Sequence, residues 1–286
     1  PLPNFMAPFF NALPLWAHKA SVAIMFLIEL GLPFLIFVPG LRWVAAVGIV
    51  GLMALILVSG NYAFFNWLTI AMTFWLLPEK FWIRIAKAVP WEWQFAEAVP
   101  GFTTFSAVVL LPVLVMSIYW SFRILLPAKV EQTFAPFVSL SLDLRVSSPY
   151  GLVANMTKVR PEIMIEGSDD GTTWKEYEFP FKPGRLDQRP PSIAPYQPRL
   201  DWQMWFAALG NFKDSQFLQR MMVQILHNSK DVLGLFSKNP FPDQAPRQIR
   251  AMIYLYEFAT PSEIFNQGIW WKRKLVGQFS PVLEKR

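Results

Sequence analysis

Long apolar stretches fill the first part of the chain. No charged residue occurs in residues 43–77 or 102–122, and Glu29 is the only charge in residues 20–38. A helix needs about 20 apolar residues to cross the hydrocarbon core of a bilayer, and buried helices of soluble proteins seldom run that long without a polar face. The pattern therefore predicts a bundle of membrane-spanning helices.

The apolar stretches are separated by helix-breaking residues. We expect residues 1–126 to form a polytopic transmembrane region with four spans, at residues 16–38, 43–59, 62–77 and 102–126. Proline or glycine follows each stretch, as is typical of helix ends. The third span is short, which suits a tilted or partly re-entrant helix.

Basic and aromatic residues are interleaved between the third and fourth spans, in residues 79–101. Lys80, Arg84 and Lys87 recur at helical spacing, which predicts an amphipathic helix at the membrane interface, or alternatively a helix in a soluble loop. Positive charge marks the cytoplasmic side. Arg42 falls on the same side, so the segment after residue 126 is expected in the lumen or periplasm.

The remaining chain, residues 127–286, reads as a soluble β-rich domain. Alternating apolar positions and β-branched or aromatic runs predict strands, at residues 138–146, 150–156, 162–166, 174–181, 248–258 and 270–279. Asp170-Gly171 lies between two of them and is a strong hairpin signal. The expected fold class is an α-helical membrane bundle followed by a mainly β, sandwich-like extracytoplasmic domain.

A helical insertion is expected within this domain. A proline-rich run precedes Asp201, which is placed to cap a short helix, and Asp214 is placed to cap a second one. A third short helix is predicted at residues 230–237. These helices carry apolar stripes that would pack on the predicted sheet.

Composition removes several classes of chemistry. The chain has no cysteine, so disulfides, thiolate catalysis and cysteine-ligated zinc are excluded. Its two histidines, His18 and His227, stand in unrelated segments and predict no metal site, and we expect no cofactor. The net charge of +6 is too mild and too mixed to indicate a nucleic-acid partner.

Three polar residues lie in or near the predicted spans. Glu29 is a functional candidate because an unpaired charge at that depth is costly; pairing with another helix, or protonation, explains it equally well. Asn61 and Asn66 flank the start of the third apolar segment. There they would hydrogen-bond across helices or cap the helix ends where the helical pattern is interrupted after Gly60.

Two further groups are candidates in the C-terminal region. Arg160, Glu162 and Asp201 suit a buried arginine–carboxylate scaffold better than a ligand site. A second group is aromatic and is either core or a partner-binding surface: Trp174, Trp202, Trp205 and Phe206.

Several motifs together resemble the lipase maturation factor family, and they extend over nearly the whole chain. They are Ser59-Gly60-Asn61-Tyr62, Phe64-Phe65-Asn66, Ile165-Glu166-Gly167-Ser168 with Asp170-Gly171 and Trp174, Arg189-Pro190-Pro191, Pro198-Arg199-Leu200-Asp201-Trp202-Gln203-Met204-Trp205-Phe206, Asn239-Pro240-Phe241 and Trp270-Trp271. The membrane motifs are weak by themselves, whereas the C-terminal blocks in this order are specific.

The resemblance implies a protein of the endoplasmic-reticulum membrane whose C-terminal domain faces the lumen. Such a factor helps secreted lipases to fold and assemble into active dimers, and it is not a known enzyme. The start at Pro1 leads us to expect a fragment of a longer protein. The absence of cysteine favours a bacterial member, which would lie in the inner membrane with its domain in the periplasm.

Two other functions remain open. One is a membrane-embedded enzyme that uses Glu29 and Asn61 in a lipid-facing cavity. The other is a glycan- or lipid-headgroup-binding module, because the hairpin block from Ile163 to Trp174 resembles discoidin-type, galactose-binding-like domains. Fold analogy alone is weak support for function.

Overall fold

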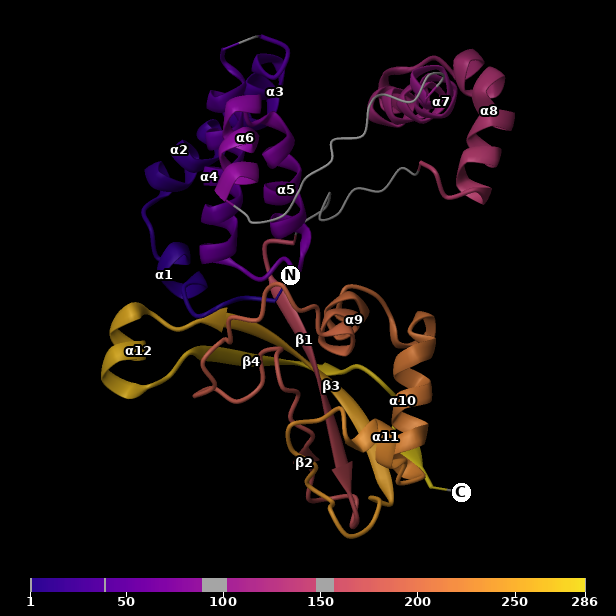
Figure 1. Ribbon diagram of the computed structural model, residues 1–286. Helices are drawn as coiled ribbons and strands as arrows, with labels where there is room; N and C mark the ends of the chain where they lie inside the picture. Colours follow the sequence, from indigo (N-terminus) through magenta and orange to yellow (C-terminus); the bar gives the residue numbers. More distant parts are fainter. Residues whose placement is uncertain (1, 39, 89–101, 148–156, 286) are drawn as a thin grey trace. The chain divides into compact units, whose positions relative to one another are not determined.

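The computed structural model describes residues 2–38, 40–88, 102–147 and 157–285 (Figure 1). The chain forms two compact units. The first contains Pro1–Arg84 and Lys158–Arg286, and the second contains Ile85–Thr157. The N-terminal helices and the C-terminal sheet therefore belong to one unit, although they are far apart in the sequence.

The helices in residues 2–88 lie mostly in the predicted apolar stretches. They are α1 (Ala7–Asn11), α2 (Leu15–Phe26), α3 (Leu32–Leu35), α4 (Arg42–Ser59), α5 (Phe65–Thr73) and α6 (Glu79–Ala88), the last of which ends in the second unit. By length and composition, Leu15–Leu35 and Arg42–Ser59 can each cross a membrane. Phe65–Leu76 is a shorter apolar helix, which agrees with the shortness of the predicted third span.

The first predicted span contains one irregular turn. Leu27–Gly31 is a π-helical turn between α2 and α3, and the N–H of Leu32 donates to the carbonyl of Leu27. Pro33 lacks an N–H, so the α-helical hydrogen bond to the carbonyl of Glu29 cannot form. The wider turn is the local consequence of that missing donor.

The second unit contains α7 (Phe102–Phe122) and α8 (Ala128–Asp143). The rings of Tyr119 in α7 and Phe134 in α8 stack at 5.4 Å, and Arg123 pairs with Glu131 at 2.7 Å. The predicted strand at residues 138–146 is therefore wrong. Its short alternation also fits a helix, and the contacts with α7 stabilise the helical form.

The C-terminal region is built on one antiparallel sheet. Its strands are β1 (Arg160–Ser168), β2 (Lys175–Glu176), β3 (Gln248–Phe258), β4 (Trp271–Gln278) and β5 (Leu283–Glu284). The order is β2-β1-β3-β4, and β5 pairs with β3. The predicted strands at residues 248–258 and 270–279 are confirmed, whereas the strand predicted at 174–181 is reduced to β2. The strand predicted at 150–156 lies outside the described residues.

Both faces of the sheet are covered by apolar side chains. On one face, Ile163, Ile165 and Ile249 are fully buried against the helical insertion. The insertion comprises α9 (Arg199–Ala208), α10 (Gln216–Leu226) and α11 (Lys230–Leu233). On the other face, Met164 and Trp271 belong to a separate aromatic cluster. The described strands form a single sheet, so the sandwich-like arrangement is not confirmed.

The helix caps differ from the sequence-based expectation. Pro198 occupies the N-cap position of α9, and Asp201 lies inside the first turn with its carboxylate directed at another segment. Ser215, rather than Asp214, precedes α10, and its side chain makes no capping hydrogen bond. Helix α11 ends at Leu233, four residues earlier than predicted.

Candidate functional site

Asn61 is the centre of a junction between the N-terminal helices and the sheet domain. Its side-chain amide donates to the carbonyls of Pro3 at 3.0 Å and Pro191 at 2.8 Å. Its side-chain oxygen accepts from the backbone N–H groups of Ile193 at 3.0 Å and Ala194 at 3.4 Å. Every hydrogen of the amide is thus used, and a buried asparagine joins three chain segments.

The first residues of the chain complete this junction. Leu2 pairs with Asn61 as an isolated antiparallel bridge. The amide of Asn4 donates to the carbonyls of Leu57 at 3.2 Å and Val58 at 2.8 Å, so it satisfies carbonyl groups in the last turn of α4. Asn4 is not among the residues predicted from the sequence. A buried asparagine beside prolines carries no periodic signal.

Three of the four aromatic candidates lie on α9, and two of them are buried at the same junction. Trp202 and Trp205 are 3% and 5% exposed, and they pack against Leu2, Phe181 and Ile193. Phe206, by contrast, is 54% exposed. The stripe is therefore divided, with the two tryptophans holding α9 in place and the phenylalanine facing outward.

The fourth aromatic candidate, Trp174, lies on the outer face of the β1–β2 hairpin. The guanidinium of Arg250 sits 3.9 Å from the centre of its ring, and that guanidinium also binds Glu166 at 2.8 Å. Glu166 and Arg250 are direct partners in the β1–β3 register. The ring of half-buried Trp174 thus stacks on Arg250, which forms a cross-strand ion pair with Glu166.

The predicted polar residues Arg160 and Glu162 lie in contact, and Lys182, which was not predicted from the sequence, joins them. Glu162 and Lys182 are both fully buried, with Lys182 Nζ 3.2 Å from one carboxylate oxygen. Arg160 Nη2 lies 2.8 Å from the other oxygen. Lys182 also donates to the carbonyl of Pro183 at 3.1 Å. Lys182 stands between prolines in a loop, where no pattern predicts burial.

Asp201 stabilises the same region through the backbone. Its carboxylate accepts from the N–H groups of Phe181 at 3.0 Å and Lys182 at 2.7 Å. Burial raises the pKa of Asp201, and those two hydrogen bonds oppose the rise. Burial likewise lowers the pKa of Lys182, against the opposing charge of Glu162. Glu162, Lys182 and Asp201 are buried, whereas the side chain of Arg160 is 19% exposed, so the cluster reaches the surface only through Arg160.

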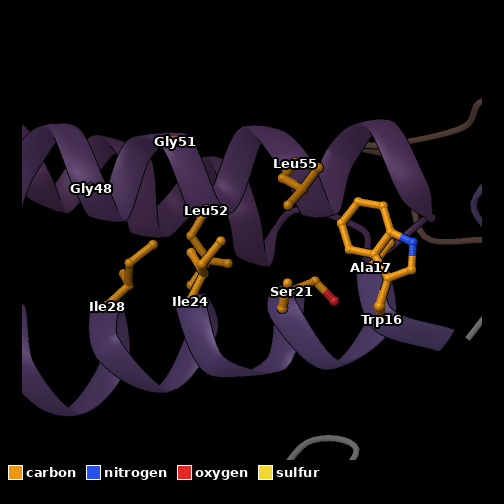
Figure 2. Close-up of a pocket in the computed structure, with 10 residues that line it drawn as sticks. Trp16, Ala17, Ser21, Ile24, Ile28, Gly48, Gly51, Leu52 and Leu55 are labelled. Atoms are coloured by element: carbon orange, nitrogen blue, oxygen red, sulfur yellow. The ribbon is translucent and has the colours of Figure 1, made fainter. Parts of the chain in front are cut away.

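A hollow of about 420 Å³ lies between α2 and α4, and Figure 2 shows the side chains that line it. Trp16 and Leu55 lie at one end of it, and Ile28 and Gly48 lie at the other. Its lining is almost wholly apolar. The hydroxyl of Ser21 donates to the carbonyl of His18 at 2.8 Å, so its proton is already used. The hollow suits hydrocarbon and offers no catalytic group.

Glu29 and Asn61 do not meet in this part of the structure. Glu29 follows Ile28 and is exposed on the π-helical turn, at the level of Gly48. A rise of about 1.5 Å per residue along α4 puts Asn61 roughly 20 Å further on. The two residues proposed for a membrane-embedded enzyme therefore occupy different places.

Asn66 connects two helices. It is buried, and its amide donates to the carbonyl of Met53 in α4 at 3.3 Å. A polar side chain that bonds across helices stabilises a membrane bundle by about 1 kcal/mol. Asn66 therefore acts within the bundle.

The described residues contain no group of three or more His, Asp or Glu side chains that could hold a metal ion. Two apolar helices that can cross a membrane, followed by a sheet-containing C-terminal region, define a membrane protein.

Both parts of the chain match one family. Residues 1–84 match the lipase maturation factor transmembrane domain, and residues 146–281 match the lipase maturation factor C-terminal domain. The chain belongs to the lipase maturation factor family.

Curated relatives extend along nearly the whole chain. Lipase maturation factor 2 of Homo sapiens is 30% identical over 98% of this chain and 54% of its own length. Lipase maturation factor 1 of Bos taurus is 30% identical over 100% of this chain and 54% of its own length. The chain thus spans about half the length of these relatives. No solved structure matches significantly.

Proposed function

We propose that this chain is the membrane-anchored part of a maturation factor that assists the folding and dimerisation of secreted lipases, and that it does so without catalysis. The names of the relatives supply the client class. The observation that carries the proposal is the junction at Asn61, because it holds the sheet domain at one end of the membrane helices. A fixed domain next to the bilayer suits a client that is folding as it leaves the membrane.

The orientation follows from α4. Arg42 begins this helix, and the junction lies just beyond its other end at Ser59. Since positive charge marks the cytoplasmic side, the sheet domain belongs on the opposite side. We place it in the lumen of the endoplasmic reticulum, or in the periplasm if the cell is bacterial.

Client contact is assigned to exposed Phe206 and to half-buried Trp174. Phe206 projects from α9, which Trp202 and Trp205 hold in place, and Trp174 stands half-buried on the hairpin. Partly folded chains expose apolar segments, and aromatic side chains are enriched at the energetic centres of interfaces. Trp202 and Trp205 contribute by positioning α9.

The proposal is tested in cells that lack the gene and secrete a reporter lipase. The full gene should restore the yield and specific activity of the lipase, and Phe206→Ser should restore less. Leu235→Ser is the matched control, because Leu235 is an exposed leucine beside α11. Unchanged lipase activity after deletion of the gene would refute the maturation role. Equal loss in the two variants would refute the assignment of Phe206.

A further inference from the structure

A second hollow lies against the N-terminal segment, and it differs in character from the hollow between α2 and α4. Its volume is about 540 Å³, and its lining is mostly aromatic. The residues that line it are Phe5, Met6, Phe9, Arg189, Ile264, Phe265 and Trp270. It therefore combines rings from α1 and its approach with rings from the β3–β4 connection and one cation.

Arg189 is held at this hollow by two aromatic rings. Its guanidinium lies 4.6 Å from the centre of the Phe5 ring and 5.7 Å from that of Trp270. The residue is exposed, and among the described residues it has no carboxylate partner. Stacked arginine keeps its charge, and its planar N–H groups suit a phosphate.

Phe265 is the most exposed ring of the hollow. It lies on α12 (Pro261–Gln267), which forms the projecting end of the β3–β4 hairpin (Figure 1). Its side chain is 75% exposed, and its ring lies 5.6 Å from that of Phe9. A capping box between Thr260 and Glu263 fixes the start of α12. A rigid turn thus presents a large apolar side chain outside the sheet.

The hollow lies at the junction end of the membrane helices. Asn4 binds the last turn of α4, and α1 with Phe9 follows five residues later. The chain then enters α2, where Leu15 and Trp16 are strongly exposed. Exposed tryptophan at the start of a span is typical of the headgroup level of a bilayer. The hollow therefore lies at the level of the headgroups, next to the sheet domain.

We propose that this hollow, with Phe265 as its projecting ring, binds phospholipid at the bilayer surface, so that α12 is a second membrane contact of the sheet domain. The phosphate of the headgroup binds Arg189. The rings of Phe5, Phe9 and Phe265 contact the upper acyl region. This inference goes beyond lipase maturation, because it concerns the purified chain and its lipids and requires no client.

The absence of cysteine makes a direct test straightforward. Asn266→Cys carries a nitroxide label next to intact Phe265 in the full chain, reconstituted into phosphatidylcholine vesicles. Electron paramagnetic resonance then compares collisions with oxygen, which enriches in lipid, and with a water-soluble nickel chelate. We expect several-fold greater oxygen accessibility than at the control label Leu235→Cys. Adding Phe265→Ser or Arg189→Gln should return the label at position 266 towards water.

Each other result overturns the proposal. A label at position 266 that is as water-accessible as the one at position 235 places α12 in solution. A label that neither reagent reaches means that protein covers the hollow. Lipid accessibility at both positions means that the sheet domain embeds without a specific contact. All of these results are independent of lipase activity, so the maturation role stands or falls separately.

Discussion

The side-chain amide of Asn61 donates to the carbonyl of Pro191, a residue 130 positions further along the chain, at 2.8 Å. The same side chain accepts from the N–H of Ile193. The side chain of Asn61 therefore supplies the hydrogen bonds that water would otherwise make to backbone groups on both sides of the junction.

Asn61→Ala should destabilise the full chain in detergent by about 2–3 kcal/mol, because it leaves buried donors and acceptors without partners. Thermal unfolding followed by tryptophan fluorescence measures the loss. Asn66→Ala is the control, because it removes one hydrogen bond inside the bundle and should cost about 1 kcal/mol. Equal losses would contradict the central role of Asn61.

Glu162→Gln should destabilise the chain by about 3–5 kcal/mol, because it leaves the buried Lys182 charge without its carboxylate. Lys182→Met in the Glu162→Gln background should recover part of the loss. The double-mutant cycle measures the coupling between the two residues. Additive losses would show that the ion pair is not coupled.

The loss of stability caused by Glu162→Gln should also depend on pH. Burial lowers the pKa of Lys182 below its ordinary value of 10.5, so the unfolded chain binds more protons than the folded chain between those two values. Stability therefore rises with pH between the folded-state and unfolded-state pKa values of Lys182. Removal of the Glu162 carboxylate lowers the folded-state pKa further, because that charge raises it, and so widens the pH range. The defect should shrink as the pH is raised from neutral towards the ordinary lysine pKa. A defect that grows with pH would refute this account.

Helix α12 should loosen in acid. The hydrogen bond from Lys272, followed by those from Thr260, lowers the pKa of Glu263 from 4.5 to about 2. The stabilisation is present above pH 4.5 and is lost as the pH falls through about 2. Amide hydrogen exchange of residues 259–270, corrected for intrinsic rates, should accelerate over that range. Glu263→Gln should abolish this dependence, and an unchanged profile in that variant would implicate another group.

Glu29→Gln should leave lipase secretion unchanged. Among the described residues Glu29 has no ion-pair partner, and it lies far from Asn61 along the helices. The reporter-lipase assay measures the effect, with Phe206→Ser as the variant expected to restore less lipase. Loss of secretion in a well-expressed Glu29→Gln protein would revive the membrane-embedded enzyme.

Local patterns predicted much of this fold. The isoleucine and aromatic residues in residues 248–258 predicted β3 with its observed bounds, because such side chains favour strands. Asp170-Gly171 predicted the hairpin correctly. The Asp170 carboxylate accepts from the N–H groups of Thr172 and Thr173, and Gly171 has a positive φ of 73°.

Distant contacts were beyond the reach of such patterns. Asp201 has the position of a helix cap in the sequence, yet its carboxylate binds the backbone of Lys182 in another segment. The alternation from Val138 to Val146 suits a strand, yet most of it continues helix α8, whose Phe134 packs on Tyr119 of α7. The burial of Lys182 depends on Glu162, which no spacing rule connects to it.

The junction at Asn61 also sets an order of assembly. Asn61 is synthesised long before Pro191 and Ile193, so its hydrogen bonds remain open while the intervening chain is made. The N-terminal helices can enter the bilayer during that interval, whereas α9 cannot dock until Trp202 and Trp205 have been translated and meet Leu2. Membrane insertion therefore precedes the closure of the sheet domain onto its helices, and a chain that stops before Pro191 leaves the junction at Asn61 open.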